Sequence, residues 1–420
     1  MNADVLVVGA GPAGLAAAIE LRRLGAGRIL VADREREAGG IPRHSAHTGY
    51  GLRDLRRVMT GPAYARHYAQ AAALAGAEIR SGSTVTGWAQ DRVAILTSPD
   101  GIETVAARAV LLATGCRERP RTARLVPGDR PSGVMTTGEL QQRVYLAGQR
   151  LPGRALVVGA EHVSFSAMVT LAHAGADVVA LVTERPRQQS YAAFALGAAL
   201  RWRVPVWTSA AVRLVLGRDR LTAVDVADLR TGAVRRVACD TLVFTGDWIP
   251  DHEQARLAGA AIDPGTRGPA VDTALATSVP AVFAAGNLVH AAETADVAAL
   301  DGLHAARHIA AALAGPSERG RPRSGERAGA TVPITVAAPL AWISPNAIRD
   351  PAPPPPRGRF LLRSEVFRRR AWLEVRQGDR LLARARARLI PGRPVHLNAG
   401  WLAGVQVSDT PVLVTVADDG

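Results

Sequence analysis

The sequence contains no lysine, so all 51 residues counted as lysine or arginine are arginine. This absence excludes Schiff-base chemistry, and it excludes a lysine placed beside a cofactor ring. The formal net charge is +14, but the arginines are dispersed among acidic residues and are not gathered with aromatic residues in one block. The charge therefore does not predict nucleic-acid binding, and a docking face for an acidic protein is the alternative use for it.

Cysteine is nearly absent, because the chain has only Cys116 and Cys239 and no C-x-x-C pair. This excludes a redox dithiol, an iron–sulfur cluster and a cysteine-rich zinc site within the chain, and we expect no metal. No apolar run reaches the roughly 20 residues of a membrane-spanning helix. We expect no signal peptide, because an apolar strand is expected almost at once and no charged segment or cleavage site comes before it. We therefore expect a cytoplasmic protein without a membrane span.

A glycine-rich turn follows the first apolar run, residues 5–8. Its glycines, Gly9, Gly11 and Gly14, fit the pattern G-x-G-x-x-G. The first glycine of this pattern makes a tight turn, the second lets the backbone approach a pyrophosphate, and the third lets the helix pack on the strand. A helix expected from about Gly11 to Leu24 would direct its N-terminal N–H groups at the phosphates.

An acidic residue ends the second expected strand. This strand covers Arg28 to Ala32, and Asp33 follows it nineteen residues after Gly14. A carboxylate at this position can accept hydrogen bonds from both hydroxyls of a ribose. Strand, helix and acid in register predict a dinucleotide-binding unit, so we expect Asp33 and its neighbour Arg34 to contact the cofactor with the three glycines.

A second copy of this pattern is altered. The apolar run 155–158 leads into Gly159, but Glu161 stands at the position of the middle glycine and Ser164 at that of the third. Glu184 stands where the ribose-binding acid belongs. A carboxylate at Glu161 would block and repel a pyrophosphate, so we expect a second site that is altered or does not function. The alternative is that Glu161 turns to solvent and the site still works weakly.

The pattern of apolar runs predicts an α/β fold with two Rossmann-like dinucleotide-binding domains, the second inserted in the first, and a C-terminal all-β domain. Alternating apolar residues predict a strand over about 78–86, and the residues after the altered turn predict a helix from about Val163 to Ala174. A strand that closes on Gly286 and a helix from about Thr294 to Ala314 indicate that the chain returns to the first domain. The expected domains are the first at 1–119 and 246–316, the second at 120–245, a linker at 317–330, and a β-rich domain at 331–420.

Several motifs together resemble the two-dinucleotide-domain flavoprotein family, which includes thioredoxin reductase, ferredoxin reductase and the pyridine nucleotide–disulfide oxidoreductases. The resemblance covers about residues 1–313, and its motifs are Gly9-x-Gly11-x-x-Gly14, Asp33, Gly39-Gly40, Ala113-Thr114-Gly115, Thr245-Gly246-Asp247 and Val282-Phe283-Ala284-Ala285-Gly286-Asn287. It implies that the first unit binds FAD and that the second is an NAD(P)-binding type, although Glu161 leaves NAD(P)H unassigned here. It also implies that Gly40, Thr114 and Gly115 lie near FAD, and that Gly286 and Asn287 hold its ribityl half. Asn287 replaces the aspartate of the family, and its amide can still accept and donate hydrogen bonds.

Three further segments resemble the alpha-type subunits of opine oxidase, hydrogen cyanide synthase and hydroxyproline dehydrogenase complexes. These are Gly39–His44, Arg117–Arg121 and Glu161–Phe165. The resemblance implies an FAD-dependent oxidoreductase that transfers electrons within a multi-component amine or amino-acid dehydrogenase or oxidase. Its partners would be a small iron–sulfur protein and a second flavoprotein subunit. The alternatives are a self-standing NAD(P)H-dependent reductase that passes electrons to a ferredoxin, quinone or small molecule, and a flavin-bound scaffold without turnover.

Candidates for chemistry beyond the cofactor are few. His44 and His47 follow the double glycine and would move protons during flavin turnover, or they are ordinary polar residues of a loop. The helix expected near Thr294 would direct its N-terminus at the flavin ring if the family geometry holds. Asp296 is then a cofactor-site residue, and an N-cap formed by Thr294 or Asp296 is the alternative.

Overall fold

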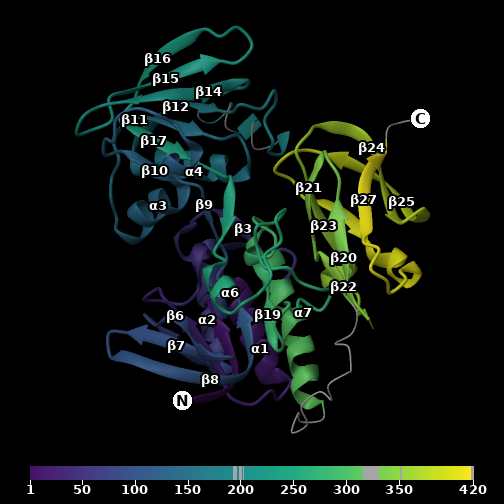
Figure 1. Ribbon diagram of the computed structural model, residues 1–420. Helices are drawn as coiled ribbons and strands as arrows, with labels where there is room; N and C mark the ends of the chain where they lie inside the picture. Colours follow the sequence, from purple (N-terminus) through teal and green to yellow (C-terminus); the bar gives the residue numbers. More distant parts are fainter. Residues whose placement is uncertain (193–195, 198–200, 202, 316–330, 351, 418–420) are drawn as a thin grey trace. The chain divides into compact units, whose positions relative to one another are not determined.

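The computed structural model describes the chain except for residues 193–195, 198–200, 202, 316–330, 351 and 418–420. The linker expected at 317–330 lies outside the described residues. The described chain forms two compact units (Figure 1). The first unit contains residues 1–43, 48–116 and 250–420, and the second contains residues 44–47 and 117–249.

A seven-stranded sheet forms the centre of the first unit. Its strands run in the order β5-β2-β1-β8-β7-β6, and β19 also pairs with β8. The pairs of β1 with β2 and β8, of β2 with β5 and of β8 with β19 are parallel, whereas β7 pairs antiparallel with β6 and β8. The strands are β1 (Asn2–Val8), β2 (Ile29–Asp33), β5 (Glu78–Ser81), β6 (Thr84–Gln90), β7 (Val93–Ser98), β8 (Gly101–Leu112) and β19 (Val282–Ala284).

One predicted strand of this sheet was wrong. The alternation over residues 78–86 predicts a single strand, but the structure divides it at Gly82, which has φ +68°. The two halves, β5 and β6, then lie at opposite edges of the sheet order. A positive φ is readily available to glycine and breaks the extended run.

Alanine-rich helices pack closely in this unit. Helix α1 (Pro12–Arg23) contacts α7 (Ala295–Ala314) along a face of small buried side chains. A Cβ atom on Gly302 of α7 would lie 2.0 Å from the carbonyl oxygen of Ala13, so the two backbones approach too closely for any side chain there. The other described elements of this part are η1 (Ile41–His44), β3 (Thr48–Tyr50), β4 (Met59–Thr60), α2 (Gly61–Leu74), α6 (Glu253–Leu257) and η4 (Gly286–Leu288).

The second unit contains a five-stranded parallel sheet in the order β10-β17-β11-β12-β13. An antiparallel sheet of β14, β15 and β16 accompanies it, and the chain enters through β9 and leaves through β18. Its elements are β9 (Cys116–Glu118), η2 (Arg121–Arg124), β10 (Val134–Thr136), α3 (Thr137–Gln141), η3 (Gln142–Leu146), β11 (Gly153–Val158), α4 (His162–Ala174), β12 (Ala176–Val182), β13 (Val206–Trp207), β14 (Ala210–Leu216), β15 (Ala223–Asp228), β16 (Val234–Ala238), β17 (Thr241–Phe244) and β18 (Trp248–Pro250).

Residues 331–417, which we call the C-terminal module, are strand-rich and have their own apolar core around Phe360, Leu373 and Trp401. One sheet has the order β22-β20-β27-β24-β25, and the other has the order β21-β23-β26. The elements are β20 (Thr331–Val336), β21 (Leu340–Ser344), β22 (Ala347–Arg349), η5 (Pro356–Gly358), β23 (Arg359–Ser364), β24 (Arg368–Gln377), β25 (Arg380–Leu389), β26 (Val395–Asn398), η6 (Ala399–Gly404) and β27 (Val412–Ala417).

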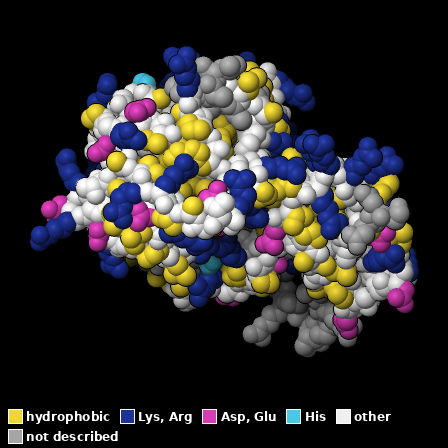
Figure 2. Space-filling model, turned by 90° about the horizontal axis from the view of Figure 1, so that it is seen from above, with side chains coloured by type: hydrophobic (Ala, Val, Ile, Leu, Met, Phe, Trp, Pro, Cys, Tyr) yellow, Lys and Arg dark blue, Asp and Glu magenta, His cyan; other side chains and the backbone are white. Residues whose placement is uncertain are grey.

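Arginine side chains are spread over the face of the molecule seen in Figure 2, among apolar and acidic side chains. None of the helices in the described ranges is long and apolar enough to span a lipid bilayer.

Candidate cofactor site

The turn between β1 and α1 is crowded at its first and last glycines and open at the middle one, Gly11. Gly9 has φ +108°, and a Cβ there would lie 2.5 Å from the carbonyl oxygen of Ala113. A Cβ on Gly14 would lie 1.9 Å from the oxygen of Gly9, whereas a Cβ on Gly11 would meet no atom within 4 Å. Gly11 is the N-cap of α1 and supplies no capping side chain. The helix therefore presents its first N–H groups at an open approach, which suits an anionic group.

Asp33 ends β2 and lies directly beside this turn. Its carboxylate is buried and accepts the N–H of Ala10 at 2.5 Å and the N–H of Glu35 at 2.8 Å. Burial raises the pKa of Asp33, and the two backbone hydrogen bonds oppose that rise. Each carboxylate oxygen can accept a further hydrogen bond, so the group can still bind a ribose hydroxyl. The side chain of Arg34 is largely exposed and lies 3.4 Å from the carboxylate of Asp251.

The double glycine and the Thr114-Gly115 turn border the same region of the first unit. Gly40 has φ +63°, and a Cβ there would lie 2.9 Å from the Cα of Gly11. The hydroxyl of Thr114 donates to the carbonyl oxygen of Asp251 at 2.7 Å, and the N–H of Asp251 donates to the carbonyl oxygen of Gly115 at 2.9 Å. The structure thus places Gly40 against the glycine turn and ties residues 114–115 to the chain that returns from the second unit.

Gly286 and Asn287 begin a loop that precedes α7. Gly286 has φ +71°, and a Cβ there would lie 2.8 Å from the Cβ of Ala13, so this glycine packs against α1. The side chain of Asn287 donates to the carbonyl oxygen of Glu293 at 3.0 Å and accepts the N–H of Glu293 at 2.8 Å. Asn287 therefore closes the segment 287–293, which we call the flavin loop because the family resemblance implies that Asn287 helps to hold the ribityl half of FAD.

Asp296 is 2% exposed in the first turn of α7. It accepts the Arg53 guanidinium at 3.1 Å and the Val297 N–H at 2.9 Å, and the hydroxyl of Thr294 donates to it. Thr294 occupies the N-cap position but makes no capping hydrogen bond with its side chain. Asp296 therefore acts at the helix start, where a carboxylate also complements the helix dipole. It also binds Arg53, a contact that no sequence motif predicts.

The second glycine turn has a carboxylate folded into it. One oxygen of Glu161 accepts the hydroxyl of Thr245 at 2.6 Å, and the other accepts the N–H of Ala160 at 2.9 Å. The N–H of Glu161 donates to the hydroxyl of Ser164 at 3.2 Å. The alternative in which Glu161 turns to solvent was wrong, because these partners within the unit hold its carboxylate at the N-terminus of α4.

The same turn is closely surrounded. A Cβ on Gly159 would lie 1.9 Å from the hydroxyl of Thr245, and one on Gly246 would lie 2.4 Å from a carboxylate oxygen of Glu161. The N–H groups of Gln189 and Ser190 donate to the carbonyl oxygen of Ala160 at 2.9 and 3.2 Å. The side chain of Glu161 thus occupies the second turn at the position where Gly11 leaves the first turn open.

Two titratable residues near this turn, the buried Glu118 and the half-buried Arg124, were not singled out by sequence. Burial raises the pKa of Glu118 to about 7, the nearby Glu161 adds to the rise, and the guanidinium of Arg124 opposes it. Arg124 donates to the carbonyl oxygens of Thr245 and Gly246 at 3.0 and 2.8 Å. Glu118 lies within the arginine-rich segment 117–121 and Arg124 lies three residues after it. The residue pattern of this segment does not predict a buried acid.

Three predicted residues lie outside the first glycine turn. His44 is buried and His47 is exposed, and both belong to the segment grouped with the second unit. Their proton-transfer role stays a prediction. Glu184 is exposed just beyond the end of β12.

Comparison with known proteins identifies the relatives of this chain. The model of the family described as pyridine nucleotide-disulphide oxidoreductase matches residues 3–302. The alpha subunit of sarcosine oxidase from Corynebacterium sp. (strain P-1) is 33% identical over 60% of this chain and 27% of its own length. One subunit of opine oxidase from Agrobacterium tumefaciens (strain Ach5) is 34% identical over 37% of this chain and 32% of its own length. The chain thus spans about a quarter to a third of these curated relatives.

Thioredoxin reductases resemble the chain over a larger share of their own length. The enzyme of Treponema pallidum (strain Nichols) is 27% identical over 68% of this chain and 88% of its own length. The crystal structure of T. acidophilum thioredoxin reductase matches with a TM-score of 0.62 at 23% identity, covering 74% of this chain and 98% of that one. This likeness confirms the two Rossmann-like domains of the expected α/β fold, and the strand-rich C-terminal region is also present.

Proposed function

The chain belongs to the pyridine nucleotide-disulphide oxidoreductase family and is an FAD-dependent oxidoreductase, and from this premise we propose a more specific role. We propose that it is the electron-transfer subunit of a multi-component amine or amino-acid dehydrogenase or oxidase. In this role it receives electrons from a partner protein and not from NAD(P)H.

The first turn fits the FAD that the family implies. We propose that Gly9, Gly11, Gly14 and Asp33 hold the adenosine and pyrophosphate half. The open approach at Gly11 and the carboxylate beside it support this assignment, because a phosphate needs free N–H donors and a ribose needs an acceptor. The exposed Arg34 is proposed at the border of the same site.

The second half of FAD is proposed to lie along the flavin loop. Gly286 and Asn287 would hold the ribityl chain, with Gly40, Thr114 and Gly115 beside the cofactor. Asp296 would act by fixing the start of α7, because its oxygens are already used by Arg53, Thr294 and Val297. The bound FAD supplies a ring that accepts and passes on electrons, and the protein supplies position and electrostatics.

The single observation that carries the proposal is the internal position of Glu161. Its carboxylate accepts the N–H of Ala160 and the hydroxyl of Thr245, and it lies where the second turn would receive a pyrophosphate. A second anion there meets repulsion and fewer free donors. We therefore propose that Gly159, Glu161 and Glu184 form no working NAD(P)H site.

Because NAD(P)H is proposed not to supply electrons, we propose that a partner protein supplies them. Relatives named as subunits of sarcosine oxidase, opine oxidase and hydrogen cyanide synthase support this proposal. The partner classes that we propose are a second flavoprotein, which oxidises the amine or amino acid, and a small iron–sulfur protein.

An anaerobic mixing experiment tests this role. The purified chain, loaded with FAD, is mixed with NADH or NADPH while the flavin absorbance is recorded, and dithionite serves as the positive control. We expect the flavin to stay oxidised with both nucleotides and to bleach with dithionite. Rapid bleaching by either nucleotide would contradict the proposal and favour the self-standing reductase.

A further inference from the structure

The C-terminal module packs against the rest of the first unit through hydrogen bonds and ion pairs. The side-chain oxygen of Asn346 accepts the N–H of Val271 at 2.8 Å, and the N–H of Asn346 donates to the carbonyl oxygen of Val271 at 3.1 Å. The guanidinium of Arg349 lies 3.5 Å from the carboxylate of Asp272. The module lies beyond the family match, which ends at residue 302.

A buried arginine of the module contacts the flavin loop. Arg363 lies 3.3 Å from the carboxylate of Glu293 and donates to the carbonyl oxygen of Ala292 at 3.4 Å. The two charged side chains are only 11% and 7% exposed. Burial raises the pKa of Glu293 and lowers the pKa of Arg363, and the attraction between them opposes both shifts.

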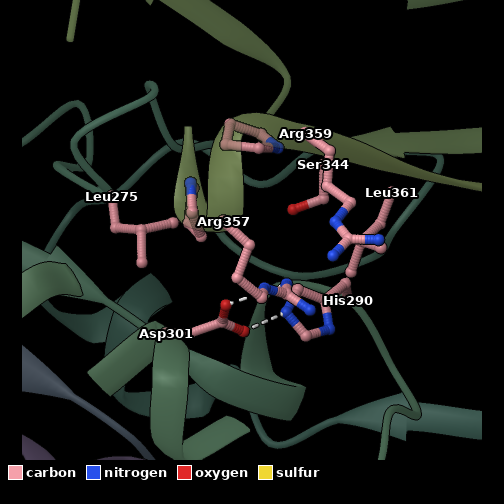
Figure 3. Close-up of a pocket in the computed structure, with 9 residues that line it drawn as sticks. Leu275, His290, Asp301, Ser344, Arg357, Arg359 and Leu361 are labelled. Carbon is pink, nitrogen blue, oxygen red and sulfur yellow. Dashed lines mark hydrogen bonds and ion pairs between the residues drawn. The ribbon is translucent and has the colours of Figure 1, made fainter. Parts of the chain in front are cut away.

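A second arginine of the module reaches the same loop through α7. In Figure 3, dashed lines join the carboxylate of Asp301 to both Arg357 and His290. The carboxylate of Asp301 is 2.5 Å from His290 and 3.0 Å from Arg357, and it is 1% exposed. Burial opposes its ionisation, but the neighbouring His290 and Arg357 charges hold the pKa of Asp301 below its usual value.

These contacts continue to the predicted ribityl ligand. Glu293 is held by Arg363 through its side chain and by Asn287 through its backbone N–H and carbonyl. His290, which Asp301 holds, lies between these two loop residues in the sequence. The flavin loop is thus fixed by the module on one side and by α7 on the other.

We propose that the C-terminal module completes the flavin site, with Arg363 as a positioning residue that orients Asn287 through Glu293. The inference rests on the proposed function, because it requires FAD at the flavin loop. The module has its own apolar core, and neither member of this ion pair belongs to it. A buried ion pair contributes little to net stability. We therefore assign the contact of Arg363 with Glu293 a role in orienting the flavin loop.

The test compares two arginines of the module in the full chain. Arg363→Met removes the contact to the loop, Arg363→Lys restores the charge, and Arg349→Met removes a contact to Asp272 outside the loop. FAD affinity is measured by fluorescence titration of the apoprotein, and the flavin midpoint potential and absorption spectrum are recorded. We expect Arg363→Met to weaken FAD binding by roughly tenfold and to shift the potential, Arg363→Lys to recover part of both, and Arg349→Met to resemble the wild type.

Equal FAD affinity and potential in Arg363→Met, Arg349→Met and the wild type would overturn the inference while leaving the proposed function intact. A wild-type chain that binds no FAD would contradict the proposed function itself. If Arg363→Met does not fold, Glu293→Gln tests the same contact from the other side, and unchanged FAD affinity and potential there would equally overturn it.

A separate observation points to a buried water site beside this contact. A cavity lined by His290, Ser344, Arg357 and Arg359 leaves about 10 Å³ for the centre of a water-sized sphere, which is room for about one water molecule. Three of these residues carry a buried polar atom with no hydrogen-bond partner among the described residues, namely Nδ1 of His290, Oγ of Ser344 and Nε of Arg357. Buried polar atoms are almost always hydrogen-bonded.

We infer that one ordered water molecule bridges these three atoms and joins the module to the rest of the first unit. A high-resolution crystal structure of the full chain should show a single peak within hydrogen-bond distance of all three. The three atoms paired with protein groups, or no peak in well-ordered density, would overturn the inference. An anomalous peak there after a bromide soak would show an anion site and would overturn it as well.

Discussion

Replacing Glu161 with glycine should open the second turn to NADH. The carboxylate now occupies the N-terminus of α4, where it accepts the N–H of Ala160 and the hydroxyl of Thr245. A unit charge about 4 Å from one phosphate charge costs about 4 kcal/mol at an effective dielectric constant near 20. Salt and partial exposure reduce this to roughly 2 kcal/mol, or about 30-fold in Kd.

Isothermal titration of the Glu161→Gly chain with NADH measures this gain. Glu161→Gln is the matched control, because it removes the charge and keeps the bulk. It should recover only part of the affinity. The two lost hydrogen bonds should lower the free energy of unfolding of Glu161→Gly by about 3 kcal/mol, which denaturant titration would show. A folded Glu161→Gly chain with unchanged NADH affinity would refute the assignment of Glu161 as the blocking group.

Three other experiments give separate tests. Gly11→Ala should leave the melting temperature of the apoprotein unchanged, because the added methyl group meets no protein atom, but it should weaken FAD binding by occupying the open approach. Gly14→Ala should unfold the chain, because the added methyl group collides with the carbonyl oxygen of Gly9. Thermal melts and FAD titrations of both variants measure these effects, and equal melting temperatures would contradict the prediction. Asp33→Ala should weaken FAD binding by roughly 2 kcal/mol, about 30-fold in Kd, because the variant loses an acceptor for the ribose hydroxyls. Fluorescence titration measures the change, and an affinity equal to that of the wild type would contradict the assignment of Asp33 to the site. Burial raises the pKa of Glu118 from 4.5 to about 7, so between these pH values the folded chain keeps a proton that the unfolded chain releases. The contribution of Glu118 to stability should therefore be complete below about pH 4.5 and should fall by roughly 3 kcal/mol as the pH rises to about 7. Denaturant titration across this range should find the fall in the wild type and not in Glu118→Gln, and a fall of equal size in both would contradict the cause.

Local patterns predicted the main elements well. The helix expected from Gly11 to Leu24 is α1 at Pro12–Arg23, and the helix expected from Val163 to Ala174 is α4 at His162–Ala174. Both follow an apolar strand and a glycine turn, so strand, turn and helix are fixed by residues close in sequence. The expected strand over 78–86 failed, because the turn at Gly82 sends β5 and β6 to different edges.

The site was predictable where it depends on backbone geometry. Glycines 9 and 14 are required by close contacts around the β1–α1 turn, and sequence alone suggests them. The inward position of Glu161 depends on Thr245, which lies 84 residues further along the chain. The contact between Arg363 and Glu293 joins residues 70 apart, which the sequence places in two separate domains. Tertiary packing brings such partners together, so the spacing of residues within a short segment cannot predict them.

A crystal structure of the full chain grown with FAD and excess NADH shows which of the two turns holds a nucleotide. We expect electron density for FAD along the first turn, with its pyrophosphate at Gly11 and its ribose at Asp33. We expect no nucleotide at the second turn, with the carboxylate of Glu161 still bonded to Ala160 and Thr245. NADH bound at Gly159 with Glu161 displaced, or FAD absent from the first turn, would contradict this expectation.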